Sequence, residues 1–290
     1  MPHGFRYCTP SRLHGVVTFL QMPVEHWLPV WQGYSGLVRH WPAPLHATPR
    51  EAQVAGRLSH PNIIAIYDVA KDERGCYMVM ELLSPHSASS RVKKKGAYQW
   101  TVASRIIADC CAALKVAHEA GIIHRDIKPD NILFSQTGVV KLVDFGLVKL
   151  MEDDLHLTQS GMLCGTPMYM SPEQARGDTL DTRSDLFSLG SVLYLMCTRQ
   201  LPFPGHSTLD ILMALVTRQP TPPAELNPAI PRALSDLVMQ LLAKEPQQRI
   251  STAAEVARQL ETIAKSKATP RLSSPSKSVP RSRSLVAAFI

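Results

Sequence analysis

The stretch that most restricts the fold of this chain is the octet His-Arg-Asp-Ile-Lys-Pro-Asp-Asn at residues 124–131, followed by Asp-Phe-Gly at 144–146. Together they place two acids, an amide and a cation in a short window. These side chains are the ones needed to move a phosphoryl group: one acid orients the attacking hydroxyl, a second acid and an amide oxygen hold Mg²⁺, and a cation neutralises the phosphate. The fold must therefore bring both groups to one cleft.

Each role has a candidate in this window. Asp126 would align the acceptor hydroxyl and take its proton, and Lys128 would neutralise charge on the γ-phosphate. Asn131 and Asp144 would bind the metal through their side-chain oxygens. An HRD tripeptide arises easily by chance, but the complete octet and the downstream Ser-Pro-Glu at 171–173 make chance a poor explanation.

This pattern resembles the catalytic loop and the magnesium loop of the protein kinase superfamily. The lysine two residues after Asp126 is typical of serine/threonine kinases, and the match is to the bacterial, eukaryotic-like type. The resemblance covers about residues 50–264 and implies an α+β, bilobal protein-kinase-like fold, with an intact, mainly helical C-lobe and an incomplete β-rich N-lobe. It also implies transfer of the ATP γ-phosphate to protein Ser/Thr hydroxyls, with Mg²⁺ as cofactor and Mn²⁺ as an alternative metal.

The resemblance assigns further residues to the nucleotide. Met80 would be the gatekeeper, the backbones of Glu81 and Leu83 would bond the adenine, and Leu133 would close the lower wall of the pocket. A core strand that ends at a loop explains the run 78–83 almost as well, so both interpretations stay open.

Residues 1–49 do not fit the resemblance. They hold three of the four tryptophans, seven prolines, one acid and no lysine. A protein kinase should carry a glycine-rich phosphate loop here, and a strand lysine well before a helix glutamate. If Glu51 is that glutamate rather than a solvated surface acid, the lysine belongs near residues 31–35, where there is no cation. The first lysine is Lys71, and Arg39 is too close to Glu51 in sequence.

Two interpretations of the segment 1–49 follow. It is either a divergent segment, for example one that binds a partner, or sequence that was not selected as a kinase lobe, as a shifted reading frame or a misassigned start would produce. The abrupt change of composition near residue 50 favours the second. Function also has two interpretations: a serine/threonine kinase, or a catalytically impaired pseudokinase or truncated lobe that acts as a binding or scaffold module.

Regulation and substrate docking are implied for the segment 147–170. Arg125, directly before the catalytic aspartate, would pair with a phosphate on this segment, and Thr158 and Ser160 are the candidate phosphosites. Thr166 would contact the catalytic aspartate and lysine. A surface arginine and ordinary loop hydroxyls are the alternatives.

Three more residues have expected structural roles. Glu173 would be buried and needs a partner, because a buried charge without one is costly; Arg249 matches the partner position in the family. Asp185 begins an apolar helix and would bond the backbone of the catalytic loop.

Periodicity predicts the remaining elements. Runs 63–69 and 76–82 are rich in β-forming residues, whereas apolar residues recur at helical spacing after Thr101, the expected helix cap. Helical spacing also recurs in the segments 185–198, 209–217, 233–243 and 252–263.

Composition limits the other function classes. Six Lys/Arg and no acid follow Glu261, so the tail supplies most of the net charge of +7 and no nucleic-acid-binding core is indicated. The six cysteines show no metal spacing and indicate reduced thiols of a cytoplasmic protein.

The expected organisation has four parts. An atypical segment at 1–49 precedes a partial N-lobe and hinge at 50–83, the C-lobe at 84–264, and a disordered basic tail rich in Ser and Pro at 265–290. We expect protein substrates and no nucleic acid. The tail would allow proximity to the cytoplasmic face of the inner membrane, if the full-length protein continues into a membrane helix.

Overall fold

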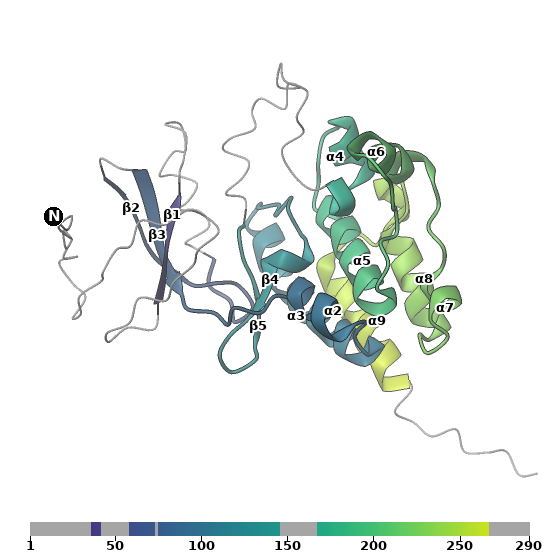
Figure 1. Ribbon diagram of the computed structural model, residues 1–290, viewed down its shortest axis with the longest axis horizontal. Coiled ribbons are helices and arrows are strands. Elements are labelled where there is room, and N and C mark those ends of the chain that lie inside the picture. The colour runs from purple at the N-terminus through teal and green to yellow at the C-terminus, as the bar shows by residue number, and fades with distance from the viewer. Residues whose placement is uncertain (1–35, 42–57, 73–74, 146–166, 267–290) are drawn as a thin grey trace, which may run out of the picture.

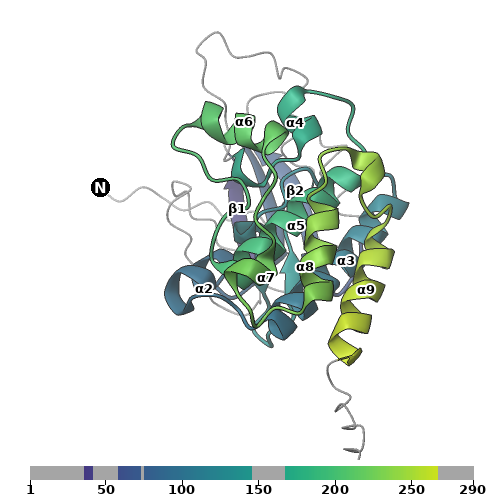
Figure 2. The ribbon, with the colours of Figure 1, turned by 90° about the vertical axis from the view of Figure 1, so that its right-hand side faces the viewer.

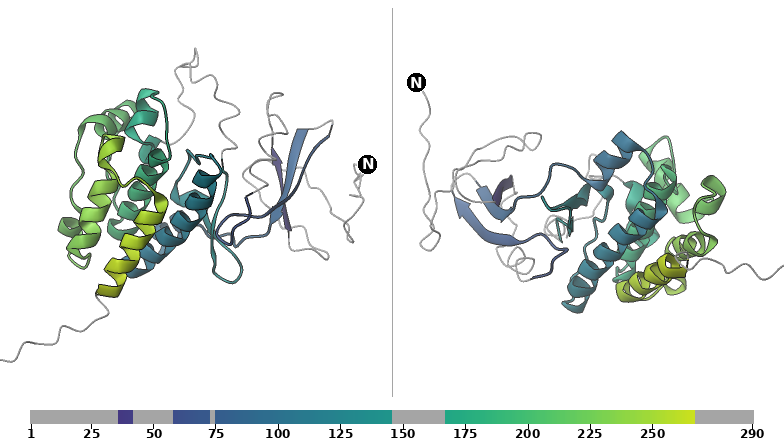
Figure 3. Two further views of the ribbon diagram at one scale, coloured as in Figure 1. Left: turned by 180° about the vertical axis from the view of Figure 1, so that it is seen from behind. Right: turned by 90° about the horizontal axis from the view of Figure 1, so that it is seen from below.

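The computed structural model describes residues 36–41, 58–72, 75–145 and 167–266. A small β-sheet lies at one end, a larger helical body lies at the other, and a short hairpin lies between them (Figure 1). The same arrangement is seen from behind and from below (Figure 3). The described part therefore has the bilobal α+β architecture predicted from the sequence.

The sheet is antiparallel, with strand order β1-β3-β2. Its strands are β1 (Gly36–Trp41), β2 (Ile66–Asp72) and β3 (Gly75–Glu81). β3 agrees with the predicted run 76–82, but β2 begins three residues later than the predicted run 63–69. Its register with β3 also shifts between Ile66 and Asp68.

The late start of β2 has a physical cause in the central hairpin. Ile63 forms an isolated parallel bridge to Leu142, and the backbone N–H of Ile64 donates to the Leu142 carbonyl at 3.1 Å. Both isoleucines are buried there. The β-forming residues Ile63 and Ile64 thus pair with strand β5 of the hairpin instead of with the three-stranded sheet.

The hairpin consists of β4 (Ile132–Phe134) and β5 (Val140–Leu142), which pair antiparallel. The helices of the larger lobe are α2 (Ala88–Lys95), α3 (Trp100–Glu119), α4 (Pro172–Arg176), α5 (Arg183–Thr198), α6 (Thr208–Thr217), α7 (Pro223–Leu226), α8 (Arg232–Leu241) and α9 (Ala253–Ser266). Short 3₁₀ turns lie at η1 (Pro129–Asn131), η3 (Pro167–Tyr169) and η4 (Pro246–Gln248). The predicted helical segments match α5, α6, α8 and α9 to within a few residues.

Helix α5 forms the centre of the larger lobe, because it is apolar on nearly every side and must be surrounded by other elements. α3 and α8 pack against it, and α9 runs alongside α3 (Figure 2). Gly190 lets α8 approach closely: a Cβ at this position would lie 2.8 Å from the Cβ of Leu241. The predicted buried central helix is confirmed.

Helix α3 begins earlier than predicted. Gln99 is its N-cap and makes no side-chain capping bond, so Thr101 lies inside the first turn. The buried face of α3 explains why: Trp100 and Ala103 are both buried, and burying them extends the helix past the hydroxyl that could have capped it.

Two further findings concern cysteines and membranes. Cys110, Cys111 and Cys197 are buried free thiols.

Among the described residues, no helix is both long and apolar enough to span a bilayer.

Candidate active site

The hairpin brings together two residues that are separated in sequence. Asn131 ends η1 directly before β4, and Asp144 follows β5 by two residues. Because the strands are antiparallel, the start of one lies beside the end of the other, and the Val143 N–H donates to the Asn131 carbonyl at 3.1 Å. The backbone of Asp144 therefore lies next to that of Asn131.

The catalytic loop joins its polar side chains directly. Lys128 Nζ lies 2.6 Å from Asp126 Oδ2, and Asn131 Nδ2 donates to the same oxygen at 3.1 Å and to the Asp126 carbonyl at 2.8 Å. Asp126 and Lys128 are each about one-third exposed, whereas Asn131 is buried. The carboxylate of Asp126 and the ammonium group of Lys128 are thus partly exposed to solvent, and the buried Asn131 holds Asp126 in place.

The donor set near Asn131 suits a hard divalent cation. Its amide nitrogen faces two acceptors of Asp126, so its Oδ1 is turned away from them. One amide oxygen and the carboxylate of Asp144 are oxygen ligands of the kind Mg²⁺ takes when substrate phosphates and water complete its shell. No cluster of three or more His, Cys, Asp or Glu able to hold a metal occurs in the described residues.

Two residues of this site have left-handed backbone conformations although they are not glycines. Arg125 has φ 68° and Asp144 has φ 64°. Such conformations cost on the order of 1–3 kcal/mol and persist only where surrounding bonds impose them.

Asp185 imposes part of this geometry. Its carboxylate accepts hydrogen bonds from the backbone N–H of His124 at 2.9 Å and of Arg125 at 2.8 Å, and its Oδ2 also lies 2.8 Å from His118 Nε2. Asp185 is buried in the first turn of α5. The predicted role of Asp185 in holding the catalytic-loop backbone is confirmed.

The His124 ring links the catalytic loop to the segment after β5. Its Nδ1 accepts from the Asp126 N–H at 3.3 Å, so Nε2 carries the proton and donates to the Val143 carbonyl at 2.9 Å. The ring also packs against Phe145 with centroids 4.7 Å apart. The sequence marked His124 only as part of the octet, and no local signal showed this bridging role.

A small apolar cluster adjoins the hairpin. It contains the buried residues Ile64, Met80, Leu83 and Val143, against which Ile66 and Leu133 pack. The structure thus brings together Met80, Leu83 and Leu133, the three apolar residues assigned to the nucleotide pocket from sequence. Val143 connects this cluster directly to Asp144.

The sequence assigned a role only to the backbone of Glu81, but its side chain also forms an ion pair with the hairpin. Its Oε2 lies 2.7 Å from Lys141 Nζ on β5, and the same Lys141 donates to the Ile63 carbonyl at 3.3 Å. The Glu81 N–H donates to the Ala65 carbonyl at 2.9 Å. The end of β3, which we call the hinge strand because it leads into the predicted hinge, is therefore joined to the hairpin by a mostly buried ion pair.

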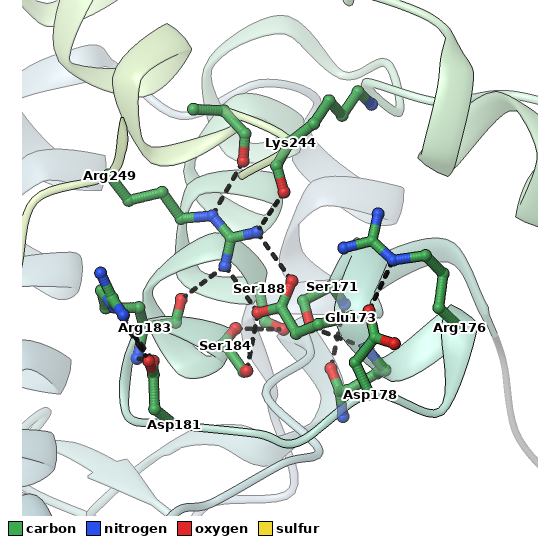
Figure 4. A network of polar contacts seen from close by, with 12 residues as sticks. Ser171, Glu173, Arg176, Asp178, Asp181, Arg183, Ser184, Ser188, Lys244 and Arg249 are labelled. Carbon is green, nitrogen blue, oxygen red and sulfur yellow. Dashed lines mark hydrogen bonds and ion pairs between the residues drawn. The ribbon is translucent and has the colours of Figure 1, made fainter. Parts of the chain in front are cut away.

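The predicted partnership of Glu173 and Arg249 is confirmed (Figure 4). Arg249 donates to both carboxylate oxygens at 2.7 Å, and Ser184 Oγ donates to Oε1 at 2.7 Å. Burial alone would raise the pKa of Glu173, but these bonds outweigh it and lower the pKa below the usual glutamate range. The pair anchors α4 to α5 and η4.

The short turn η3 lies near the catalytic loop. Burial, with the negative charge of Asp130 as a second cause, raises the pKa of Tyr169 to about 12. Tyr169 therefore lies within electrostatic range of Asp130 in the catalytic loop.

Four predicted site residues lie outside the described residues: Glu51, Thr158, Ser160 and Thr166. The strand lysine that the family resemblance calls for near residues 31–35 is missing from the sequence. Strand β1 lies after that segment and runs antiparallel beside β3. Its residue Arg39 is in register with Met78, two positions from the pair Leu37–Met80. Arg39 lies too close to Glu51 in the sequence to match the spacing expected for the strand lysine.

Comparison with known proteins agrees with this geometry. The family model described as protein kinase domain matches residues 40–260. Serine/threonine-protein kinase PknB of Mycobacterium leprae is 42% identical over 211 residues, which are 71% of this chain and 34% of that protein. The probable serine/threonine-protein kinase CE0033 of Corynebacterium efficiens is 41% identical over 225 residues, which are 74% of this chain and 34% of that protein.

The chain thus spans about a third of the length of these relatives. Among solved structures, the crystal structure of Rad53 1-466 in complex with AMP-PNP matches with a TM-score of 0.62 and 31% identity, covering 72% of this chain and 53% of that one. The family match over most of the chain agrees with the loop that holds Asp126, Lys128 and Asn131 together, and the chain belongs to the protein kinase family.

Proposed function

We propose that this chain carries the catalytic domain of a serine/threonine protein kinase, which transfers the γ-phosphate of ATP to Ser and Thr hydroxyls of proteins. The observation that carries the proposal is the contact of Lys128 and Asn131 with one carboxylate oxygen of Asp126, with Asp144 held beside Asn131. The relatives named serine/threonine-protein kinases support the same substrate class.

The side chains then have complementary tasks. Asp126 orients the acceptor hydroxyl and accepts its proton, and Lys128 moves its ammonium group from Asp126 toward the γ-phosphate as negative charge is redistributed there. Phosphoryl transfer has a loose transition state, so positioning and electrostatic stabilisation supply most of the catalysis. We assign a docking role beside this pair to Thr166 and a phosphate-pairing role to Arg125, with Thr158 and Ser160 as its candidate partners.

The nucleotide would occupy the space beside the cluster of Met80, Leu83, Val143 and Leu133, with its adenine against the backbones of Glu81 and Leu83. Asn131 and Asp144 would hold Mg²⁺, or Mn²⁺ in its place. When bound, the metal neutralises phosphate charge and fixes the phosphate geometry. ATP and a divalent cation are therefore the proposed substrate and cofactor.

A second candidate function has its own support. No lysine precedes Lys71, so the cation normally expected on the strand beside the hinge strand is not a lysine here. Loss of one preorganised charge typically lowers the rate by about 10²–10³-fold. A domain that binds partners without turnover would show the same fold and the same ion pairs.

Turnover of Mg-ATP by the purified chain separates the two candidates. For a kinase we expect slow phosphorylation of Ser/Thr in a general protein substrate, with little autophosphorylation, which stops in Asp126→Asn and Asp144→Asn. Arg232→Gln, at an arginine that is 93% exposed, is the control and should keep the wild-type rate. Equal, background-level incorporation by wild type and Asp126→Asn would favour the binding module.

Further proposals concern organisation. We propose the division 1–49, 50–83, 84–264 and 265–290, with protein substrates as partners and no nucleic acid. Proximity of the basic tail to a membrane and a cytoplasmic location stay predictions from the sequence.

A further inference from the structure

We propose that Gln174 is a positioning residue for Asp126: its side-chain amide connects the first turn of α4 to the backbone carbonyl of Arg125. The proposal rests on the kinase function above, because Asp126 is the residue that Gln174 would orient. It follows from the hydrogen bonds to the two sides of the Arg125–Asp126 peptide unit, which comes directly after the left-handed φ of Arg125.

The peptide unit between Arg125 and Asp126 needs external support. Arg125 adopts φ 68°, and Asp185 accepts from the Arg125 N–H, which belongs to the preceding peptide unit. On the N–H side of the Arg125–Asp126 peptide itself, the Asp126 N–H donates to His124 Nδ1 at 3.3 Å. On the opposite side, Gln174 Nε2 donates to the Arg125 carbonyl at 2.8 Å. The plane of this peptide determines the direction in which the Asp126 side chain leaves the backbone, so the bond from Gln174 helps to aim the carboxylate.

The Gln174 amide is held at both ends. Its Oε1 accepts from the Ser171 N–H at 2.9 Å while its Nε2 donates to Arg125. A flipped amide would place its NH₂ group against an N–H and its oxygen against a carbonyl, so the hydrogen-bond network fixes one orientation. The Gln174 N–H in turn donates to Ser171 Oγ at 3.3 Å, which completes a capping box.

The position of α4 in the chain connects the Gln174–Arg125 hydrogen bond to the proposed substrate-docking segment. Only Met170 and Ser171 separate α4 from η3 (Pro167–Tyr169), and η3 comes directly after Thr166 in the sequence. Glu173, the neighbour of Gln174, is fixed by Arg249 and therefore makes α4 a rigid support. One side chain thus couples the end of the proposed substrate-docking segment to the catalytic loop over 49 positions of sequence.

A change of Gln174 to Glu separates capping from positioning. A glutamate at the third position of a helix completes a capping box and interacts favourably with the helix dipole, so it keeps the bond to Ser171. An ionised carboxylate cannot donate to the Arg125 carbonyl. Gln174→Glu should therefore keep the capping bond of α4 and replace the link to the catalytic loop by an unfavourable contact between two acceptor oxygens.

The experiment compares Gln174→Glu with Ser171→Ala and with Gln247→Glu, which makes the same charge change at an exposed site. For Gln174→Glu we expect kcat to fall about tenfold and the backbone amides of Arg125 and Asp126 to exchange hydrogen about fivefold faster. KM for ATP should stay within about twofold and the melting temperature should not fall. Ser171→Ala should lower the melting temperature with kcat within about twofold, and Gln247→Glu should match wild type.

Two results would overturn the proposal. One is a Gln174→Glu protein whose kcat and amide exchange both match wild type. The other is a Ser171→Ala protein whose kcat falls as far as that of Gln174→Glu, which would mean that α4 acts only through its general stability. If wild type itself shows no turnover, the proposed kinase function fails, and the exchange of the Arg125 and Asp126 amides alone decides whether Gln174 holds this peptide.

Discussion

Arg249 uses all of its guanidinium N–H groups in the interior of the larger lobe. Besides Glu173, they reach the carbonyls of Ala243, Arg183 and Lys244 at 2.8, 3.1 and 2.9 Å. A buried ion pair of this kind is weak evidence for net stabilisation, because desolvation of both charges opposes their attraction. Removing one partner is different, since it leaves the other charge buried without compensation.

Arg249→Ala should therefore lower the free energy of unfolding by about 3–5 kcal/mol. The Glu173 carboxylate would keep only its bond from Ser184 among its side-chain partners shown here, and three backbone carbonyls would lose a donor. Urea unfolding followed by circular dichroism measures the change, with the exposed Arg232→Ala as control. A loss below about 1 kcal/mol would contradict the predicted role.

The Glu173 pKa also predicts a dependence of stability on pH. The folded state lowers this pKa relative to the unfolded chain, where a glutamate titrates near about 4.3. The ionised pair thus stabilises the fold above that pH, and this contribution is lost as the pH falls through the lower, folded pKa. The stability difference between wild type and Glu173→Gln should stay nearly constant from pH 7 to about pH 5, and should shrink as urea unfolding is repeated below the unfolded-chain pKa of about 4.3 toward the lower folded pKa. A difference that grows with acid would contradict this.

The helices α5 and α8 show how one element determines the approach of another. Gly190 faces the Cβ of Leu241, and the neighbouring Ser191 is buried with no hydrogen-bond partner for its Oγ among the described residues. At Gly190 there is too little room for a methyl group. At Ser191 the buried hydroxyl has lost its hydrogen bonds to water without gaining one to the described protein.

Gly190→Ala should destabilise the protein by about 1–3 kcal/mol, because the new Cβ would lie 2.8 Å from a Cβ that cannot rotate away. Ser191→Ala should be neutral or stabilising, because it removes an unpaired buried hydroxyl. Chemical unfolding of both variants tests the pair. Equal destabilisation by both would show that general disturbance of α5, not the local contacts, controls the result.

At the scale of the whole molecule, the hairpin β4–β5 connects the sheet to the helical body. Ile63 and Ile64 bond to β5, Lys141 pairs with Glu81, and the Ser84 N–H donates to the Phe134 carbonyl at 2.8 Å. The proposed metal ligands flank the same hairpin: Asn131 directly precedes β4, and Asp144 lies two residues after β5. Ligand binding at this junction should therefore stabilise both lobes together.

Mg-ATP should raise the melting temperature of the wild-type chain, because a ligand present at about 100 times its Kd adds about 2.7 kcal/mol of stability. Chelation of the metal with EDTA should reduce this shift, as should Asp144→Asn, which removes a carboxylate ligand. Differential scanning fluorimetry with ATP alone, with Mg-ATP and with Mg-ATP plus EDTA makes the measurement. A shift that Asp144→Asn leaves unchanged would contradict metal binding at Asp144.

The sequence by itself predicted candidate residues for the chemistry and located the main helices. The octet at 124–131 fixed the acid, cation and amide, and the apolar pattern after Asp185 predicted a buried helix, because helical burial has a period that one-dimensional spacing records. The match of Arg249 to Glu173 came from the family resemblance.

Only the tertiary structure decided the contacts that have no local pattern. Ile63 and Ile64 look like the start of a strand but bond to β5, and Gln174, for which the sequence predicted no role, reaches Arg125. Each of these bonds joins segments about 50 to 80 residues apart, and a side chain's partner at such a distance depends on how the intervening helices pack. Local spacing carries no record of that packing, so it predicted candidate residues for the chemistry but not the residues that hold them in place.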